Sequence, residues 1–125
     1  KPLEFTASDG TLILVGKNNT QNDRLTFKIA SPNDIWLHTK DIPGSHVIIK
    51  ATLETVSQDA LQEAAMLAAY YSKSQASSQV PVSYTPRKNV KKPKGAKPGM
   101  VIYTDYKTIY VTPKVEALPK KASAQ

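Results

Sequence analysis

Hydrophobic and polar residues alternate over several short stretches of the chain, which is the spacing of β-strands with one buried face. These stretches cover residues 4–7, 11–15, 34–38, 45–50, 80–85, 100–104 and 108–112. Turn-forming residues separate neighbouring stretches, and the segments 8–10 and 105–107 each predict a hairpin. The pattern therefore predicts about seven short strands.

Two further stretches carry apolar residues at helical spacing. Residues 57–74 have a face of alanine, leucine and tyrosine side chains wide enough to pack on a sheet, and Ser57 is a suitable N-cap. Residues 20–30 predict a shorter helix. Its inward-facing residues would be Asn22, Leu25 and Ile29.

Strands and helices together predict an α+β fold with a single domain. We expect a mostly antiparallel sheet of short strands, with one long helix and one short helix packed on it. The domain is expected to span residues 1–113, and residues 114–125, rich in Lys, Ala and Ser, are expected to form a flexible C-terminal tail.

The composition narrows the class of protein. With 125 residues, of which 40% are hydrophobic, the chain is long enough for one folded domain with a core. The absence of cysteine excludes disulfides, a thiolate nucleophile and cysteine-based zinc sites. No apolar run approaches the roughly 20 residues of a membrane span, and no signal peptide opens the chain. Of these features, the absence of cysteine fits a cytoplasmic origin.

The segment from residue 34 to residue 50 contains the only Trp and both His residues of the chain. On a strand, Asp34, Trp36 and His38 share one face. Ile35 and Leu37 share the other, which we expect to be buried. We interpret the first face as facing a ligand, because the aliphatic residues already supply the core contacts. The structural alternative is that Asp34 accepts a hydrogen bond from an imidazole and that Trp36 is a partly covered core anchor.

Two kinds of chemistry are weighed against this interpretation. Asp34, His38, Asp41 and His46 are possible metal ligands, but their spacing is not that of a usual metal site. Ser45 lies beside His46, but no nucleophile elbow surrounds it. We therefore expect no catalysis, no metal and no cofactor.

Positive charge is concentrated in one segment. The chain has a net charge of +7, and residues 87–97 hold six cations and no acid, which leaves 11 basic against 10 acidic residues elsewhere. Pro and Gly residues between 86 and 99 predict an exposed loop outside helices and strands. Such a patch is typical of binding to a polyanion, most often nucleic acid. A solvated loop without a partner is the alternative, and an anionic membrane is disfavoured because no amphipathic apolar face accompanies the charges.

Four amide side chains cluster at the start of the shorter predicted helix. They are Asn18, Asn19, Gln21 and Asn22. Ordinary helix capping would account for them. Alternatively, their amides and the helix N–H groups would donate hydrogen bonds to a phosphate or to base edges.

The motif Asp-x-Trp-x-His at residues 34–38, followed by Lys-Asp-x-Pro-Gly-Ser-His-Val at 40–47, resembles the signature of the NFACT-R domain. This is the RNA-binding module of ribosome-quality-control factors that are also called fibronectin-binding protein A-like. The resemblance extends over residues 5–113. Its further segments are 16–19, 21–23, 82–85, 90–93 and 97–99. Members of the family carry an NFACT-N domain and helical segments before this module, so we expect the chain to be a C-terminal part of a longer protein.

The resemblance implies binding to tRNA and to the large ribosomal subunit, in support of alanine tailing of stalled nascent chains. It also implies a cytoplasmic, ribosome-associated protein, and it assigns the signature to Asp34, Trp36 and His38. The alternative is a cell-surface adhesin domain that binds fibronectin or fibrinogen. Unpaired bases stack on aromatic and imidazole rings while cations hold the phosphates. The predicted RNA-binding residues are Asp34, Trp36, His38, Lys40, His46, Arg87, Lys88, Lys91, Lys92, Lys94 and Lys97.

Overall fold

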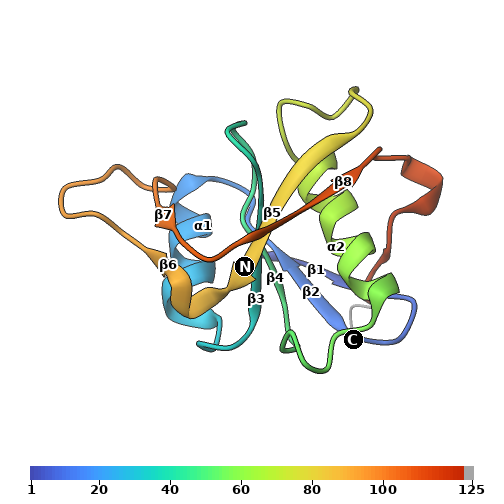
Figure 1. Ribbon diagram of the computed structural model, residues 1–125, viewed down its shortest axis with the longest axis horizontal. Helices are drawn as coiled ribbons and strands as arrows, with labels where there is room; N and C mark the ends of the chain where they lie inside the picture. The colour runs from blue at the N-terminus through green and yellow to red at the C-terminus, as the bar shows by residue number, and fades with distance from the viewer. Residues whose placement is uncertain (123–125) are drawn as a thin grey trace.

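The computed structural model describes residues 1–122, which form an α+β domain around one antiparallel sheet. The seven strands lie in the order β8-β5-β3-β4-β2-β1-β9 (Figure 1). Their bounds are β1 Leu3–Thr6, β2 Leu12–Val15, β3 Ile35–Thr39, β4 Val47–Ile49, β5 Val80–Pro86, β8 Lys107–Val111 and β9 Lys120–Lys121. The predicted fold class is confirmed. The predicted hairpin around residues 8–10 is also present, because β1 pairs with β2 in antiparallel register.

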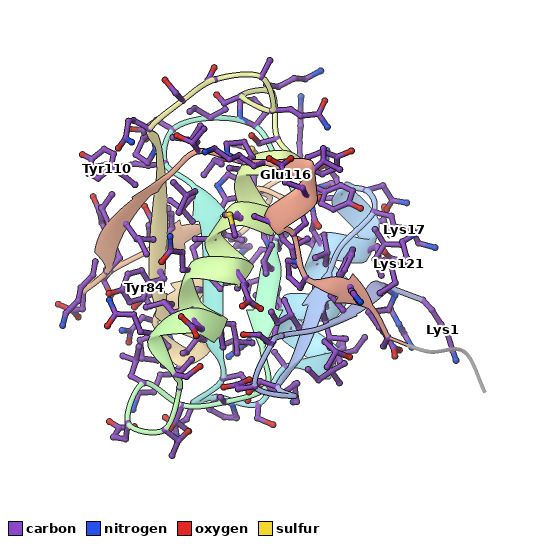
Figure 2. The ribbon with its side chains drawn as sticks, turned by 90° about the vertical axis from the view of Figure 1, so that its right-hand side faces the viewer. Lys1, Lys17, Tyr84, Tyr110, Glu116 and Lys121 are labelled. Carbon is purple, nitrogen blue, oxygen red and sulfur yellow. The ribbon has the colours of Figure 1, made fainter. Side chains whose placement is uncertain are left out.

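Helix α2 (Gln58–Tyr70) covers one face of the sheet, and in Figure 2 it lies in front of the strands. Ser57 is its N-cap, as predicted, and its hydroxyl accepts a hydrogen bond from the Ala60 N–H at 3.0 Å. Small side chains on the helix let it lie close to the sheet. The strand residues buried beneath it include Ile13, Val15, Ile35, Leu37, Val47, Ile49 and Val82.

A second layer covers the opposite face of the sheet (Figure 1). It consists of α1 (Asn19–Arg24), the wider helical turn η1 (Leu25–Ile29), and a separate two-stranded sheet of β6 (Val90–Lys91) and β7 (Ile102–Tyr103). The buried residues of this second core are Leu14, Leu25, Trp36, Ile48 and Val90. Both faces of the central strand β3 are therefore covered.

The short helix is only partly as predicted. Asn22 and Leu25 are buried, but Ile29 is 37% exposed, so its expected inward position is wrong. The cause is the change from α- to π-helical geometry: the Ala30 N–H donates to the carbonyl of Leu25, five residues earlier. A π-turn shifts the following side chains around the helix axis.

Two strands pair differently from the prediction. Residues 100–104 and 108–112 were expected to form a hairpin, but β7 pairs with β6 whereas β8 pairs with β5. Asp105, with φ 52°, turns the chain between them. The basic segment is also not entirely a loop, because η2 (Arg87–Asn89) and β6 lie within it. Alternation locates a strand in the sequence but does not choose its partner.

The C-terminal segment is packed on the domain, in contrast to the expected flexible tail. The 3-10 turn η3 (Val115–Ala117) precedes β9, which pairs with β1, and partly buried Leu118 packs against the main core. The domain therefore extends beyond residue 113, and residues 123–125 of the expected tail lie outside the described residues. Across residues 1–122, no helix combines the length and the apolar character needed to cross a membrane.

Candidate nucleic-acid interface

His46 joins four parts of the chain around the second core. Its Nδ1 accepts a hydrogen bond from the indole N–H of Trp36 at 3.2 Å and lies 2.8 Å from the Thr26 hydroxyl. Its Nε2 lies 3.2 Å from the Gly99 carbonyl oxygen. Because an indole can only donate, Nδ1 is the acceptor and Nε2–H donates to Gly99. Burial lowers the pKa of His46 to about 3, and His38 nearby acts in the same direction, so the ring is neutral at pH 7.

Trp36 is completely buried, and the predicted exposed position of its indole is wrong. The indole lies parallel to the His38 ring, with 7° between the planes and 5.8 Å between the centroids. Its other neighbours are the Tyr103 ring at 4.8 Å and the His46 ring at 5.3 Å. Trp36 and His38 thus share a strand face, as predicted. This face is covered by the second layer rather than by solvent.

His38 differs from His46 in what holds it. Its ring makes no hydrogen bond to another side chain of residues 1–122, and it is only partly buried. Burial lowers the pKa of His38, while the backbone at Thr39 and Gly44 partly opposes this effect. The ring is therefore neutral at pH 7, and it stacks on Trp36 beside the backbone of Thr39 and Gly44.

A cleft of about 420 Å³ opens beside these rings. His38 and Tyr103 line it together with the turn at Pro43-Gly44 and the segment 98–101, and Asn19 and Asp41 also border it. Gly99 adopts φ +86°, a conformation that favours glycine, and its N–H donates to the Asp23 carboxylate at 2.9 Å. The side of the cleft formed by residues 98–101 is thus anchored both to α1 and to His46.

Asp34 lies outside this cleft and stabilises the start of β3. Its carboxylate accepts hydrogen bonds from the Ser31 N–H at 2.8 Å and from Lys50 Nζ at 2.5 Å. Its carbonyl accepts from the N–H of Arg87 at 2.7 Å. The alternative in which Asp34 accepts a hydrogen bond from an imidazole is therefore not found among residues 1–122, and this carboxylate instead bonds Ser31 and Lys50.

Two of the six cations in residues 87–97 hold the segment on the domain. Arg87 Nε donates to the Thr26 carbonyl at 2.6 Å, and its guanidinium lies 5.0 Å from the Phe27 ring. Lys92 Nζ pairs with the Asp23 carboxylate at 3.1 Å and donates to the carbonyls of Lys97 and Met100. These contacts use the charges of Arg87 and Lys92 within the domain.

The other four cations of the segment point to solvent. Lys88, Lys91, Lys94 and Lys97 are exposed, and none of them forms an ion pair within residues 1–122. Lys40 is partly buried, with its ammonium 5.4 Å from the Tyr106 ring. The structure therefore divides the predicted basic residues into a structural pair and an exposed set.

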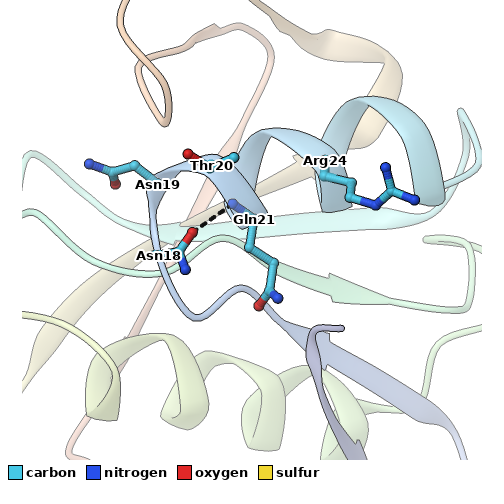
Figure 3. Close-up of a pocket in the computed structure, with 5 residues that line it drawn as sticks. All are labelled: Asn18, Asn19, Thr20, Gln21 and Arg24. Carbon is cyan, nitrogen blue, oxygen red and sulfur yellow. Dashed lines mark hydrogen bonds between the residues drawn. The ribbon is translucent and has the colours of Figure 1, made fainter.

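The amide cluster is largely explained by capping. In Figure 3 the Asn18 side chain accepts a hydrogen bond from the Gln21 N–H, at 2.8 Å. The Gln21 side chain accepts from the Lys17 N–H, and buried Asn22 accepts from the His46 N–H. Asn19 extends away from Gln21 (Figure 3), toward the cleft that it borders. Capping and backbone contacts thus account for the amide oxygens of Asn18, Gln21 and Asn22. They do not account for the NH2 groups of Asn18 and Gln21, which line a surface pocket with Asn19.

Comparison with known proteins places this geometry in a family. A sequence model described as the NFACT protein RNA binding domain matches residues 1–105. The chain belongs to this family. It is 51% identical over 116 residues to the Rqc2 homolog RqcH of Bacillus subtilis (strain 168), and 52% identical over 114 residues to that of Streptococcus suis (strain 05ZYH33). These matches cover 93% and 90% of the chain but 20% of each relative. The NFACT RNA-binding domain described here therefore spans about a fifth of those proteins.

A solved structure supports the same assignment. The C-terminal part of the fibronectin/fibrinogen-binding protein from Streptococcus suis superposes with a TM-score of 0.90 at 50% sequence identity. The match covers 94% of this chain and 47% of that structure. The resemblance inferred from the motif around Trp36 is thus confirmed over nearly the whole NFACT RNA-binding domain.

Several residues of the site were not predicted. Thr26, Asp23 and Gly99 hold the network around His46, and Tyr103 adds a ring to the cleft. The family resemblance included the segments 21–23 and 97–99, which contain Asp23 and Gly99, but it gave these two residues no role. Within residues 1–122, no group of three or more His, Asp and Glu side chains is arranged to hold a metal ion.

Proposed function

We propose that this domain binds RNA through the exposed lysines of residues 88–97 and the cleft beside them. The observation that carries the proposal is the arrangement of charge: four exposed lysines without acids in the segment, on a backbone anchored by Arg87 and Lys92. Lysines on such an anchored segment can meet phosphates without first ordering a loop. Neutral rings beside them suit unpaired bases.

The predicted site residues have different parts in this proposal. His38 and Lys40 lie near enough to the surface to contact RNA, together with the exposed lysines. Asp34, Trp36 and His46 act by positioning, because they are buried and bonded to other parts of the domain. We propose that the domain works by binding rather than by catalysis and needs no cofactor.

At the level of the whole protein, we propose a ribosome-quality-control factor. Family membership and the names of the relatives support this assignment. The finer activity that the resemblance implies is binding of tRNA and the large ribosomal subunit in support of alanine tailing, by a cytoplasmic, ribosome-associated protein. Co-sedimentation of the chain with purified large subunits tests the domain's share of this activity; no co-sedimentation at low salt would contradict it.

Fluorescence anisotropy with a labelled single-stranded RNA tests RNA binding directly. If four lysines meet phosphates, the slope of log affinity against log salt is expected to be about −3 to −3.5, from roughly 0.7–0.9 per contact. The variant with Lys88, Lys91, Lys94 and Lys97 changed to Ser should lose most of the affinity and nearly all of the slope. No binding by the wild type would refute the proposal.

A matched control removes the same charge elsewhere. Lys1, Lys114, Lys120 and Lys121 are also exposed, and they lie near the chain termini, with Lys1 and Lys121 labelled in Figure 2. Changing these four to Ser lowers the net charge by an equal amount. The control should keep most of the affinity. An equal loss in both variants would mean that net charge, rather than the proposed surface, attracts the RNA.

A second candidate function is binding to fibronectin or fibrinogen at the cell surface. It is favoured by the name of the structurally similar protein from Streptococcus suis. Surface plasmon resonance with fibronectin, before and after nuclease treatment of both proteins, separates the two candidates. Saturable binding that survives nuclease and is not competed by RNA would support adhesion, whereas binding lost on nuclease treatment would reflect the basic surface.

A further inference from the structure

The cleft beside His38 has no positive charge of its own. With His38 and His46 neutral at pH 7, Asp41 is the only charged side chain among the residues that line it. A phosphate would meet no cation there and would face a carboxylate. The cleft therefore suits an uncharged group, while the phosphates of the same molecule would have to lie on the lysines outside.

The rings in the cleft offer flat surfaces to such a group. His38 stacks on the buried indole of Trp36, and Tyr103 contacts the same indole at 4.8 Å between centroids. Pro43 and Met100 add apolar surface, and Met100 is 60% exposed. A volume of about 420 Å³ falls within the range of roughly 300–1,000 Å³ typical of small-molecule sites.

The cleft is also held open by contacts that do not involve a ligand. The Gly99 carbonyl is bonded to His46 and its N–H to Asp23, while His46 is bonded to Trp36. All polar atoms of the His46 ring are thus used within the domain. The ring of His38, in contrast, interacts with the backbone at Thr39 and Gly44 and stacks on Trp36. Because it also lines the cleft, the ring can present a face to a ligand.

From this arrangement we infer that the cleft holds one unpaired base of the bound RNA, stacked beside His38. The strand's phosphates leave the cleft past Lys97, which directly precedes the segment 98–101. Asn19 and Asp41 offer amide and carboxylate groups to the polar edge of the base. This inference rests on the proposed RNA-binding function, and it assigns the position of the base within that function.

Nuclear magnetic resonance on the wild-type chain tests the inference without any substitution. Trp36 is the only Trp, so its indole N–H gives a single resonance, and this group contacts both His38 and His46. Adenosine, cytidine, guanosine or uridine 5′-monophosphate at millimolar concentration should shift this resonance and the Gly99 amide. Ribose 5-phosphate, which lacks a base, should shift neither.

Other outcomes of this titration overturn the inference. Equal shifts with ribose 5-phosphate would mean that the cleft responds to phosphate. A response to N-acetylleucinamide but to none of the four nucleotides would assign the cleft to an apolar peptide side chain instead. No response to any compound would leave the cleft without a base-binding role.

An RNA in which every base is replaced by an abasic site separates this inference from the proposed function. The wild type should bind the normal RNA about 5- to 150-fold more tightly than the abasic RNA, the worth of stacking one base. His38→Ala should abolish this preference, whereas the lysine variant should weaken both RNAs and keep it. Equal binding of both RNAs by the wild type would refute the base cleft alone; binding of neither would refute the proposed function.

Discussion

Replacing Trp36 by Ala is expected to cost the domain about 3–5 kcal/mol of its free energy of unfolding, the usual cost of removing a buried aromatic side chain. Trp36 is completely buried in the second core, between strand β3 and the layer of α1 and β6–β7. Its indole N–H also donates to His46. The substitution thus removes apolar burial and one buried hydrogen bond together.

The magnitude is large compared with the whole stability of a domain, which is typically about 5–15 kcal/mol. The Trp36→Ala domain should therefore still fold in the cold but melt at a much lower temperature. Urea unfolding followed by far-ultraviolet circular dichroism is the suitable assay, because the variant lacks the only Trp and has no indole fluorescence. Trp36→Phe, which keeps a ring behind His38, should lose about 1–3 kcal/mol.

RNA binding by the same variants decides whether Trp36 is a core residue or a direct contact to RNA. At low temperature, Trp36→Phe should lose less binding free energy than one base stack, which is worth about 1–3 kcal/mol. The opposite result would refute a core role for Trp36. In that case Trp36→Ala would have an unfolding free energy within about 1 kcal/mol of the wild type and would lose RNA binding.

Three further predictions follow from the same contacts. Lys92→Met should lower stability by about 1–3 kcal/mol, because Asp23 loses its charged partner. Lys94→Met should leave urea unfolding unchanged and reduce the salt slope of RNA binding by about 0.7–0.9. Equal effects of the two substitutions on stability would contradict the distinction between structural Lys92 and exposed Lys94. Burial holds the pKa of His46 at about 3 in the folded state, well below its ordinary value of 6.5. The unfolded state therefore binds more protons below pH 6.5, and stability is lost as pH falls, by about 2.5 kcal/mol between pH 7 and pH 4.5. Equal urea midpoints at pH 7 and 4.5 would contradict the buried, neutral ring. Removing residues 114–125 should lower the melting temperature, because β1 loses its partner β9. An unchanged melting temperature would mean that these residues form a flexible tail, as expected from the sequence.

The sequence was sufficient to predict most strands, the long helix and its cap at Ser57, because hydrophobic alternation and capping are local signals. Pairing was less predictable: β7 and β8 lie next to each other in sequence, yet each pairs with an earlier strand. Residue spacing within a strand gives no information about which strand it pairs with, because the pairing contacts lie in other parts of the chain.

The same limit applies to the site. Alternation correctly placed Trp36 and His38 on one strand face, but it could not show that α1 and β6–β7 cover that face. Charge counting found the basic segment but could not separate Lys92, paired with Asp23, from exposed Lys94. His46 was predicted to contact RNA because its structural role could not be recognised from the sequence. Its hydrogen-bond partners Thr26 and Gly99 lie 20 and 53 residues away along the chain.

Photochemical crosslinking tests the location of the RNA interface most directly. A single-stranded RNA containing 4-thiouridine would be irradiated on the 125-residue chain, and the crosslinked peptides would be identified by mass spectrometry. Crosslinks should concentrate in residues 88–103 and at His38. Crosslinks confined to α2 or to residues 114–122, with none in the basic segment or the cleft, would contradict the proposed surface.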